Sequence, residues 1–115
     1  MFYENMPLYL LLIEILKIEY TYIHNVQKEY KYSLGDEVIC LTWNIIDLFI
    51  EAQTTNANTG EKKKIVTTIA QKLECLKLRI RFLTELKQLS LHQTTHINEL
   101  VVGIGKMIGS WQKNV

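Results

Sequence analysis

Apolar residues recur along this chain at intervals of three and four residues, the spacing of a helix that buries one face. In residues 8–26 the repeating set is Leu8, Leu12, Ile15, Leu16, Ile23 and Val26. In residues 33–53 the set is Leu34, Val38, Leu41, Ile45, Leu48 and Phe49. Pro7 precedes the first set, where a proline favours a helix start. The pattern predicts one helix over each range.

Two serines mark predicted helix starts. Ser33 is followed three residues later by Asp36, and Ser90 by Gln93, so each pair resembles a capping box. Residues 27–32 are then a polar and aromatic connection, and the segment T-T-N-A-N-T-G at 54–60 is a loop.

The second half of the chain predicts helices over 61–89 and 91–112. The first of these has two apolar stripes on different sides. One consists of Ile65, Ile69, Leu73, Leu76, Ile80 and Leu83, and the other of Leu78, Phe82, Leu86 and Leu89. A helix with two apolar stripes needs two partners. We expect the first stripe to face the core and the second to contact a neighbouring subunit.

The last predicted helix has a single stripe, formed by Ile97, Leu100, Val101, Ile104, Met107, Ile108 and Trp111. With 115 residues, five glycines and one proline, the chain is typical of one domain with long helices. Short connections between successive helices favour antiparallel neighbours. The predicted fold is all-α, an antiparallel up-down four-helix bundle.

Charge is distributed unevenly. The net charge is +1, but residues 1–61 carry −6 and residues 62–115 carry +7. An asymmetry of this kind indicates either packing of one half against the other or a basic face for a polyanion.

The basic residues of the third predicted helix fall on two faces. Lys77 and Arg81 are four residues apart and share one face, whereas Lys72 and Arg79 are seven apart and share another. Arg79 lies between the apolar stripes, where its charge requires a carboxylate, a phosphate or open water. Glu99 or an acid of the first half would be an ordinary partner.

Other candidate chemistry is weaker. The glycines of G-I-G-K-M-I-G at 103–109 lack the dinucleotide-binding spacing and follow no strand. We interpret them as positions of close helix–helix packing or of a loosened final turn. His92, His96 and Glu99 share a helix face and form a conceivable zinc site without a fourth ligand. No serine or cysteine has a base in reach, so a catalytic nucleophile is not indicated. We therefore expect no enzyme activity, no cofactor and no bound metal.

The N-terminal sequence and the cysteines indicate a location. The apolar run at 8–13 is interrupted by Glu14 and Lys17, far short of the roughly 20 apolar residues of a membrane span. Cys40 and Cys75 have no metal-binding spacing, and we expect two reduced thiols in the core. The sequence predicts a cytoplasmic protein without a membrane segment.

Several segments resemble the accessory variability determinant (Avd) family of diversity-generating retroelements. They are Y-S-L-G at 32–35 with Ala52, L-E-C-L-K-L-R-I-R-F-L at 73–83, L-S-L at 89–91 with Gln93, and I-G-K-M-I-G-S-W at 104–111. The resemblance covers residues 8–113, and the last motif is the most specific. The chain departs from the family in its near-neutral charge and in the segment Q-K-E-Y-K at 27–31, which has no proline.

The resemblance implies a barrel-like homopentamer of four-helix bundles. It also implies an accessory protein, not an enzyme, that binds a reverse transcriptase and RNA or DNA and supports mutagenic retrohoming. The candidate binding residues are Lys72, Lys77, Arg79, Arg81 and Lys106, the last of which is implied by the family's basic position between the final glycines. The alternative is a protein-binding scaffold without nucleic-acid binding, similar to the four-helix bundles encoded in ribosomal RNA intervening sequences.

Overall fold

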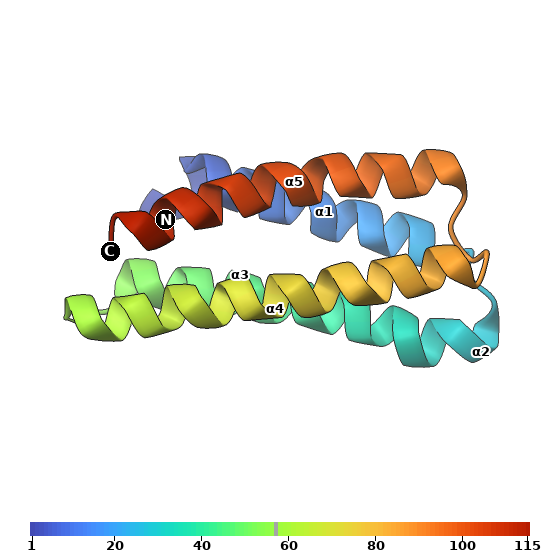
Figure 1. The fold of residues 1–115 in the computed structure, drawn as a ribbon, viewed down its shortest axis with the longest axis horizontal. Coiled ribbons are helices and arrows are strands. Elements are labelled where there is room, and N and C mark those ends of the chain that lie inside the picture. Colours follow the sequence, from blue (N-terminus) through green and yellow to red (C-terminus); the bar gives the residue numbers. More distant parts are fainter. Residues whose placement is uncertain (57) are drawn as a thin grey trace.

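Four long helices form an antiparallel bundle in a computed structural model that describes residues 1–56 and 58–115 (Figure 1). They are α1 (Pro7–Ile23), α3 (Asp36–Thr54), α4 (Thr59–Glu85) and α5 (Leu91–Lys113). Three short elements complete the chain: η1 (Phe2–Asn5), α2 (Lys28–Tyr30) and the π-helical turn η2 (Lys31–Gly35). The predicted all-α four-helix bundle is confirmed. None of the helices in the described ranges is long and apolar enough to cross a membrane.

Each long helix packs against two neighbours, in the cyclic order α1, α3, α4, α5. Both termini lie at the end of the bundle where α3 connects to α4 (Figure 1). The core contains the predicted stripe of α1, the stripe of α4 with Val66 in place of the half-buried Ile65, and the stripe of α5 except the half-buried Met107 and Trp111. On α3 the prediction is only half right: Val38, Ile45 and Phe49 are buried together with Ile46 and Ala52, whereas the predicted Leu34, Leu41 and Leu48 are half-buried.

The chain between α1 and α3 differs from the prediction. Residues 28–35 are helical, so the predicted connection over 27–32 and the capping box of Ser33 are wrong. The Ser33 hydroxyl donates to the Glu29 carbonyl 2.9 Å away instead of accepting at a helix start. A Cβ atom on Gly35 would lie 2.8 Å from Cγ2 of Ile23, so glycine permits the close approach of this turn to α1.

The connection between α4 and α5 ends α4 earlier than predicted. The Gln88 and Lys87 amides donate to the carbonyls of Leu83 and Thr84, the pattern of a Schellman motif. Lys87 takes the left-handed conformation, φ 61°, that glycine usually occupies at this position. Because no glycine marks the turn, the apolar pattern alone extended the predicted helix to residue 89.

The start of α5 agrees with the prediction. The Ser90 hydroxyl accepts from the Gln93 amide at 3.1 Å, and the Gln93 side chain accepts from the Ser90 amide at 2.9 Å. At the start of α4, Asn58 caps the helix by accepting from the Glu61 amide. The predicted loop over 54–60 is therefore shorter than expected, and Ala57 within it lies outside the described residues.

Ser90→Ala is expected to lower the free energy of unfolding by about 1 kcal/mol, because the substitution removes one half of the capping box. Urea denaturation measures the change. Ser110→Ala, at an exposed position within the same helix, is the matched control and should leave the midpoint nearly unchanged. Equal effects of the two substitutions would contradict a stabilising role for the cap.

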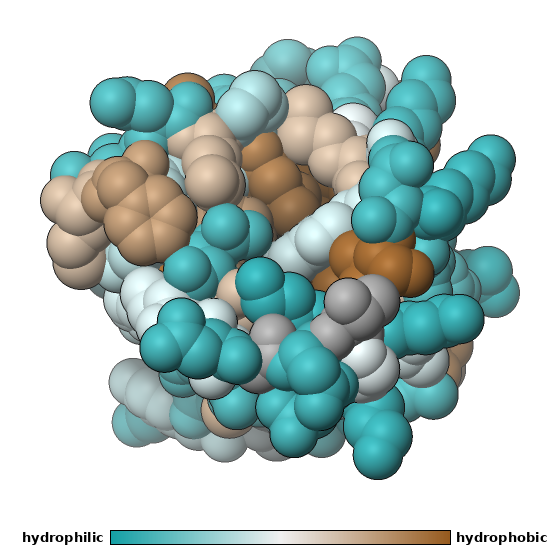
Figure 2. Space-filling model, turned by 90° about the vertical axis from the view of Figure 1, so that its left-hand side faces the viewer, coloured by the Kyte–Doolittle hydropathy of each residue, from teal (hydrophilic) through white to brown (hydrophobic). Residues whose placement is uncertain are grey.

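The glycines of α5 are not equivalent. A Cβ atom on Gly103 would lie 3.3 Å from Cδ1 of Leu11, so the predicted packing role is confirmed for the contact of α5 with α1. Around Gly109 a Cβ atom would meet nothing within 4 Å, so the packing interpretation is wrong there. Two residues after Gly109, the Trp111 ring packs edge-on against the Phe49 ring, with the two ring centroids 5.8 Å apart. Both rings line an apolar recess of about 390 Å³ at the end of the bundle that Figure 2 shows.

Candidate nucleic-acid interface

A groove of about 510 Å³ with both polar and apolar walls runs between α4 and α5. The residues that line it from α4 are Lys77, Ile80, Arg81, Thr84 and Glu85, and those from α5 are Thr94, Asn98, Val101 and Val102. The predicted pairing of Lys77 with Arg81 on one helix face is confirmed, since both border this groove. Cations beside amide and hydroxyl groups can contact phosphate and sugar oxygens.

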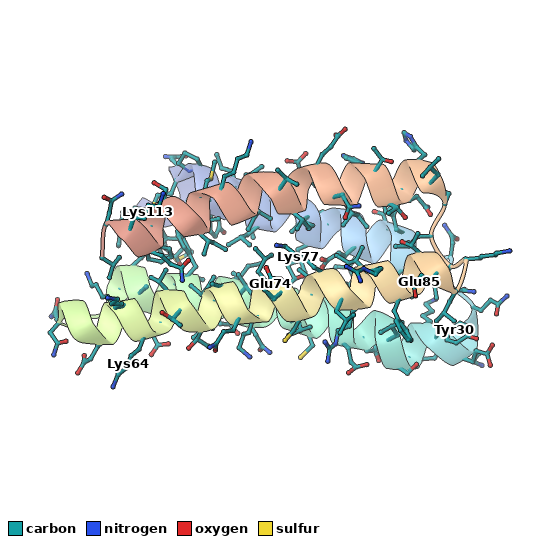
Figure 3. All side chains as sticks on the ribbon, viewed as in Figure 1. Tyr30, Lys64, Glu74, Lys77, Glu85 and Lys113 are labelled. Atoms are coloured by element: carbon teal, nitrogen blue, oxygen red, sulfur yellow. The ribbon has the colours of Figure 1, made fainter. Side chains whose placement is uncertain are left out.

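The two cations of the groove differ in their surroundings. Nζ of Lys77 lies 2.7 Å from Oε1 of Glu74, one turn earlier on α4, and both side chains are exposed (Figure 3). Exposed pairs of this kind contribute at most about 1 kcal/mol, so a phosphate can replace the carboxylate at little cost. Arg81 is exposed and forms no ion pair within residues 1–56 and 58–115.

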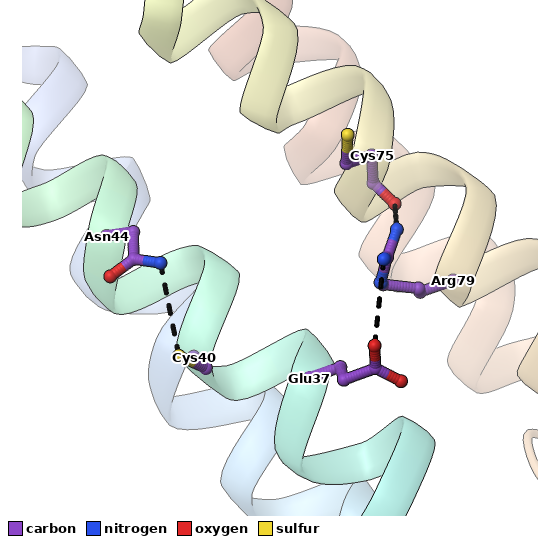
Figure 4. Close-up of polar contacts among 5 residues, drawn as sticks. All are labelled: Glu37, Cys40, Asn44, Cys75 and Arg79. Atoms are coloured by element: carbon purple, nitrogen blue, oxygen red, sulfur yellow. Dashed lines mark hydrogen bonds and ion pairs between the residues drawn. The ribbon is translucent and has the colours of Figure 1, made fainter.

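Arg79 lies on the other side of α4, facing α3 (Figure 4). Nη2 of Arg79 is 3.6 Å from Oε1 of Glu37, and Nη1 donates to the Cys75 carbonyl at 3.1 Å. An acid of the first half therefore partners Arg79, one of the two alternatives that the sequence left open. Lys72 is on the same face of α4, seven residues earlier.

Lys106 occupies a third position, exposed on α5. The helical positions of the five predicted basic residues thus separate them into two pairs and a single lysine. Only Lys77 and Arg81 share a groove, which makes this pair the stronger candidate for contact with a polyanion.

The predicted subunit stripe is only partly on the surface. Leu78 and Phe82 are 53% and 51% exposed, and they line a shallow groove between α3 and α4 with Leu34, Glu37 and Arg79. Leu86 is half-buried, and Leu89 is 5% exposed within the chain's own core. Leu89 reaches the core because the turn at Lys87 takes it off the line of α4.

The histidines form a different contact from the one the spacing suggested. Nδ1 of His96 lies 2.8 Å from the Tyr22 hydroxyl, so His96 connects α5 to α1. No group of three metal-binding side chains comes together in the described part of the chain. His92 and Glu99 border the same small surface depression as His96.

Both cysteine thiols are exposed, so their predicted place in the core is wrong. Cys40 lies four residues after the exposed Asp36 on the outer side of α3, and Asn44 donates to its sulfur at 3.9 Å (Figure 4). The type of side chain did not predict burial here, because the residues of the neighbouring stripe already fill the core.

Two polar residues of the core were missed. Glu19 of α1 and Thr42 of α3 are buried together and hydrogen-bonded. The signal for Glu19 was present, because it lies three residues after Leu16 and four before Ile23, on the predicted apolar stripe.

The fold and the groove define a class of protein: a small helical bundle with a groove on one side that carries Lys77 and Arg81 beside Glu85. The chain matches the bAvd-like family model over residues 12–115. It therefore belongs to the bAvd-like family, the bacterial Avd accessory proteins of diversity-generating retroelements. No curated protein shows significant similarity to the chain.

Proposed function

We propose that this chain is a non-enzymatic accessory protein that binds RNA or DNA together with the reverse transcriptase of its retroelement and supports mutagenic retrohoming. The observation that carries the proposal is the α4–α5 groove, where Lys77 and Arg81 stand beside Thr94 and Asn98. Membership of the bAvd-like family supplies the biological setting.

Phosphate contacts would supply most of the binding energy. Arg81 offers a planar fork of donors that fits a phosphate in two-point contact, and Lys77 adds a mobile point charge. The overall charge of +1 does not oppose this role, because a polyanion responds to the local field of a groove. Binding of this kind falls steeply with salt, since each phosphate contact releases counterions.

The assembly we propose is a homo-oligomer, a pentamer as the family resemblance implies. The exposed Leu78 and Phe82 support it, because two large apolar side chains one turn apart form a continuous surface. Neighbouring copies that cover this surface would remove it from water. The binding grooves of a ring would then act together on one nucleic acid.

Fluorescence anisotropy of a labelled single-stranded RNA tests the nucleic-acid role. We expect saturable binding at about 50 mM salt and a linear fall of log affinity with log salt. A flat response at low salt would remove nucleic-acid binding from the proposal. Adding the purified reverse transcriptase of the same retroelement then tests for a ternary complex by size-exclusion chromatography.

A second candidate is a protein-binding scaffold without nucleic-acid binding. The observation in its favour is an exposed aromatic pair between α1 and α3, where Nε1 of Trp43 donates to the Tyr20 hydroxyl at 3.0 Å and the two side chains are 43% and 50% exposed. The scaffold predicts the flat RNA response together with retained binding to the reverse transcriptase.

A further inference from the structure

One ionisable group lies in the middle of an otherwise apolar core. Glu19 of α1 is 1% exposed and Thr42 of α3 is 0% exposed, and they are the only polar side chains among the buried residues of the described ranges. Oγ1 of Thr42 is 2.8 Å from Oε2 of Glu19. The other carboxyl oxygen, Oε1, is buried without a hydrogen-bond partner among the described atoms.

The contact between Thr42 and Glu19 has too few hydrogen-bond donors for an ionised Glu19. Thr42 has one hydroxyl proton and two acceptors in reach, Oε2 of Glu19 at 2.8 Å and the Val38 carbonyl at 3.2 Å. An ionised carboxylate would take that single proton and still leave Oε1 without a donor. A protonated Glu19 can donate to Oγ1 of Thr42, which in turn donates to Val38. The neutral form therefore makes one more hydrogen bond, and Oε1, which has no donor in either form, is then a neutral carbonyl oxygen and not part of a buried charge.

No neighbouring charge offsets the preference of Glu19 for its neutral form. The charged side chains of the two helices that pack against α1 are all exposed: Asp36, Glu37, Asp47 and Glu51 on α3, and Glu99, Lys106 and Lys113 on α5. None of them forms an ion pair with Glu19, and the half-buried His96 of α5 is hydrogen-bonded to Tyr22. Burial raises the pKa of Glu19 from 4.5 to about 8, and the hydrogen bond from Thr42 opposes the rise only in part.

We propose that Glu19 and Thr42 form a proton-dependent contact between α1 and α3, protonated in the folded bundle and weakened when Glu19 loses its proton. The contact is separate from the α4–α5 groove and does not depend on the function proposed above. The contact makes the stability of the bundle depend on pH, because an ionised Glu19 in the core can reach water only when α1 and α3 separate.

The direction of the response follows from proton binding. Between pH 4.5 and about 8 the folded chain holds a proton at Glu19 that the unfolded chain has released. The stabilisation from this group is therefore complete below pH 4.5 and is lost as the pH rises toward 8. One proton changes the unfolding equilibrium constant by up to about tenfold per pH unit in this window.

Urea unfolding of the full chain at pH values from 5 to about 9 tests the proposal. Wild type should lose stability with rising pH, whereas Glu19→Gln should show a flatter dependence because it cannot ionise. Glu14→Gln, at an exposed position on the same helix, is the matched control and should keep the wild-type slope. Thr42→Val removes the one donor to the ionised form, so the upper end of the titration should move to higher pH.

Carboxyl ¹³C NMR of the glutamate-labelled wild type gives an answer even where a variant fails to fold. We expect one glutamate resonance to titrate near pH 8, to be absent in Glu19→Gln or Glu19→Met, and to persist in Glu14→Gln. The proposal is overturned if every glutamate carboxyl of the wild type titrates below about pH 6. It is equally overturned if wild type and Glu19→Gln unfold with the same pH dependence.

Discussion

Replacing Lys77 and Arg81 together by glutamate is expected to weaken RNA binding by at least about tenfold at low salt. Both side chains border the α4–α5 groove, so the double substitution replaces its two positive charges by two negative ones beside Glu85. If each residue contacts one phosphate, the slope of log affinity against log salt should fall by about two. Anisotropy titrations at several salt concentrations measure both quantities. The helical circular dichroism should be unchanged, because both side chains are exposed.

The matched control is Lys17→Glu combined with Lys28→Glu. It changes the net charge by the same amount, but at exposed positions on α1 and α2, away from the groove. A small loss of affinity is expected from the change in overall charge. If the control weakens binding as much as the Lys77 and Arg81 variant, the groove has no special role and net charge alone governs binding.

The net charge of the whole chain understates the positive charge at the α4–α5 groove, because many of the acidic and basic residues lie on different helices. The acidic α3, with Asp36, Glu37, Asp47 and Glu51, packs beside the basic α4. Only one ion pair joins these helices in the described residues, between Glu37 and Arg79. The remaining acids of α3, Asp36, Asp47 and Glu51, form no ion pair in the described residues. A net charge near zero therefore coexists with two cationic side chains in one groove: Lys77, which pairs with the exposed Glu74, and Arg81, which forms no ion pair in the described residues.

Periodicity predicted the bundle because each long helix buries a single face. The stripes of α1, α4 and α5 depend only on which residues repeat every three or four positions, and those faces are buried. The connections depended on contacts distant in the sequence. Gln88 accepts from the Gln27 amide at 2.9 Å, a contact between the two turns at one end of the bundle that no local pattern contains.

The same distinction applies to the candidate sites. The shared face of Lys77 and Arg81 follows from their spacing alone, so the sequence predicted it. The pairing of Arg79 with Glu37 required knowing which helix packs beside α4. The burial of Glu19 opposed the ordinary preference of a carboxylate for water, so a polarity-based prediction placed it outside the core.

The largest expected effect on assembly comes from Leu78→Glu combined with Phe82→Glu. Each side chain is about half exposed in the single chain, so covering the rest in an oligomer would contribute about 1 kcal/mol per residue. A carboxylate enclosed at such an interface without a partner costs more than that gain. The dissociation constant of the oligomer should therefore rise well over tenfold. Sedimentation velocity at micromolar concentration should show a monomer in place of the wild-type oligomer.

Leu91→Glu separates this effect from a general loss of surface hydrophobicity. Leu91 is 82% exposed at the first position of α5, where an acidic residue suits the helix N-terminus. The substitution should leave the wild-type oligomer intact. Because Leu78 and Phe82 are already half exposed, the double variant should keep its helical signal and its cooperative unfolding as a monomer. If wild type is itself a monomer, or the double variant remains an oligomer, neighbouring copies do not use this surface of α4.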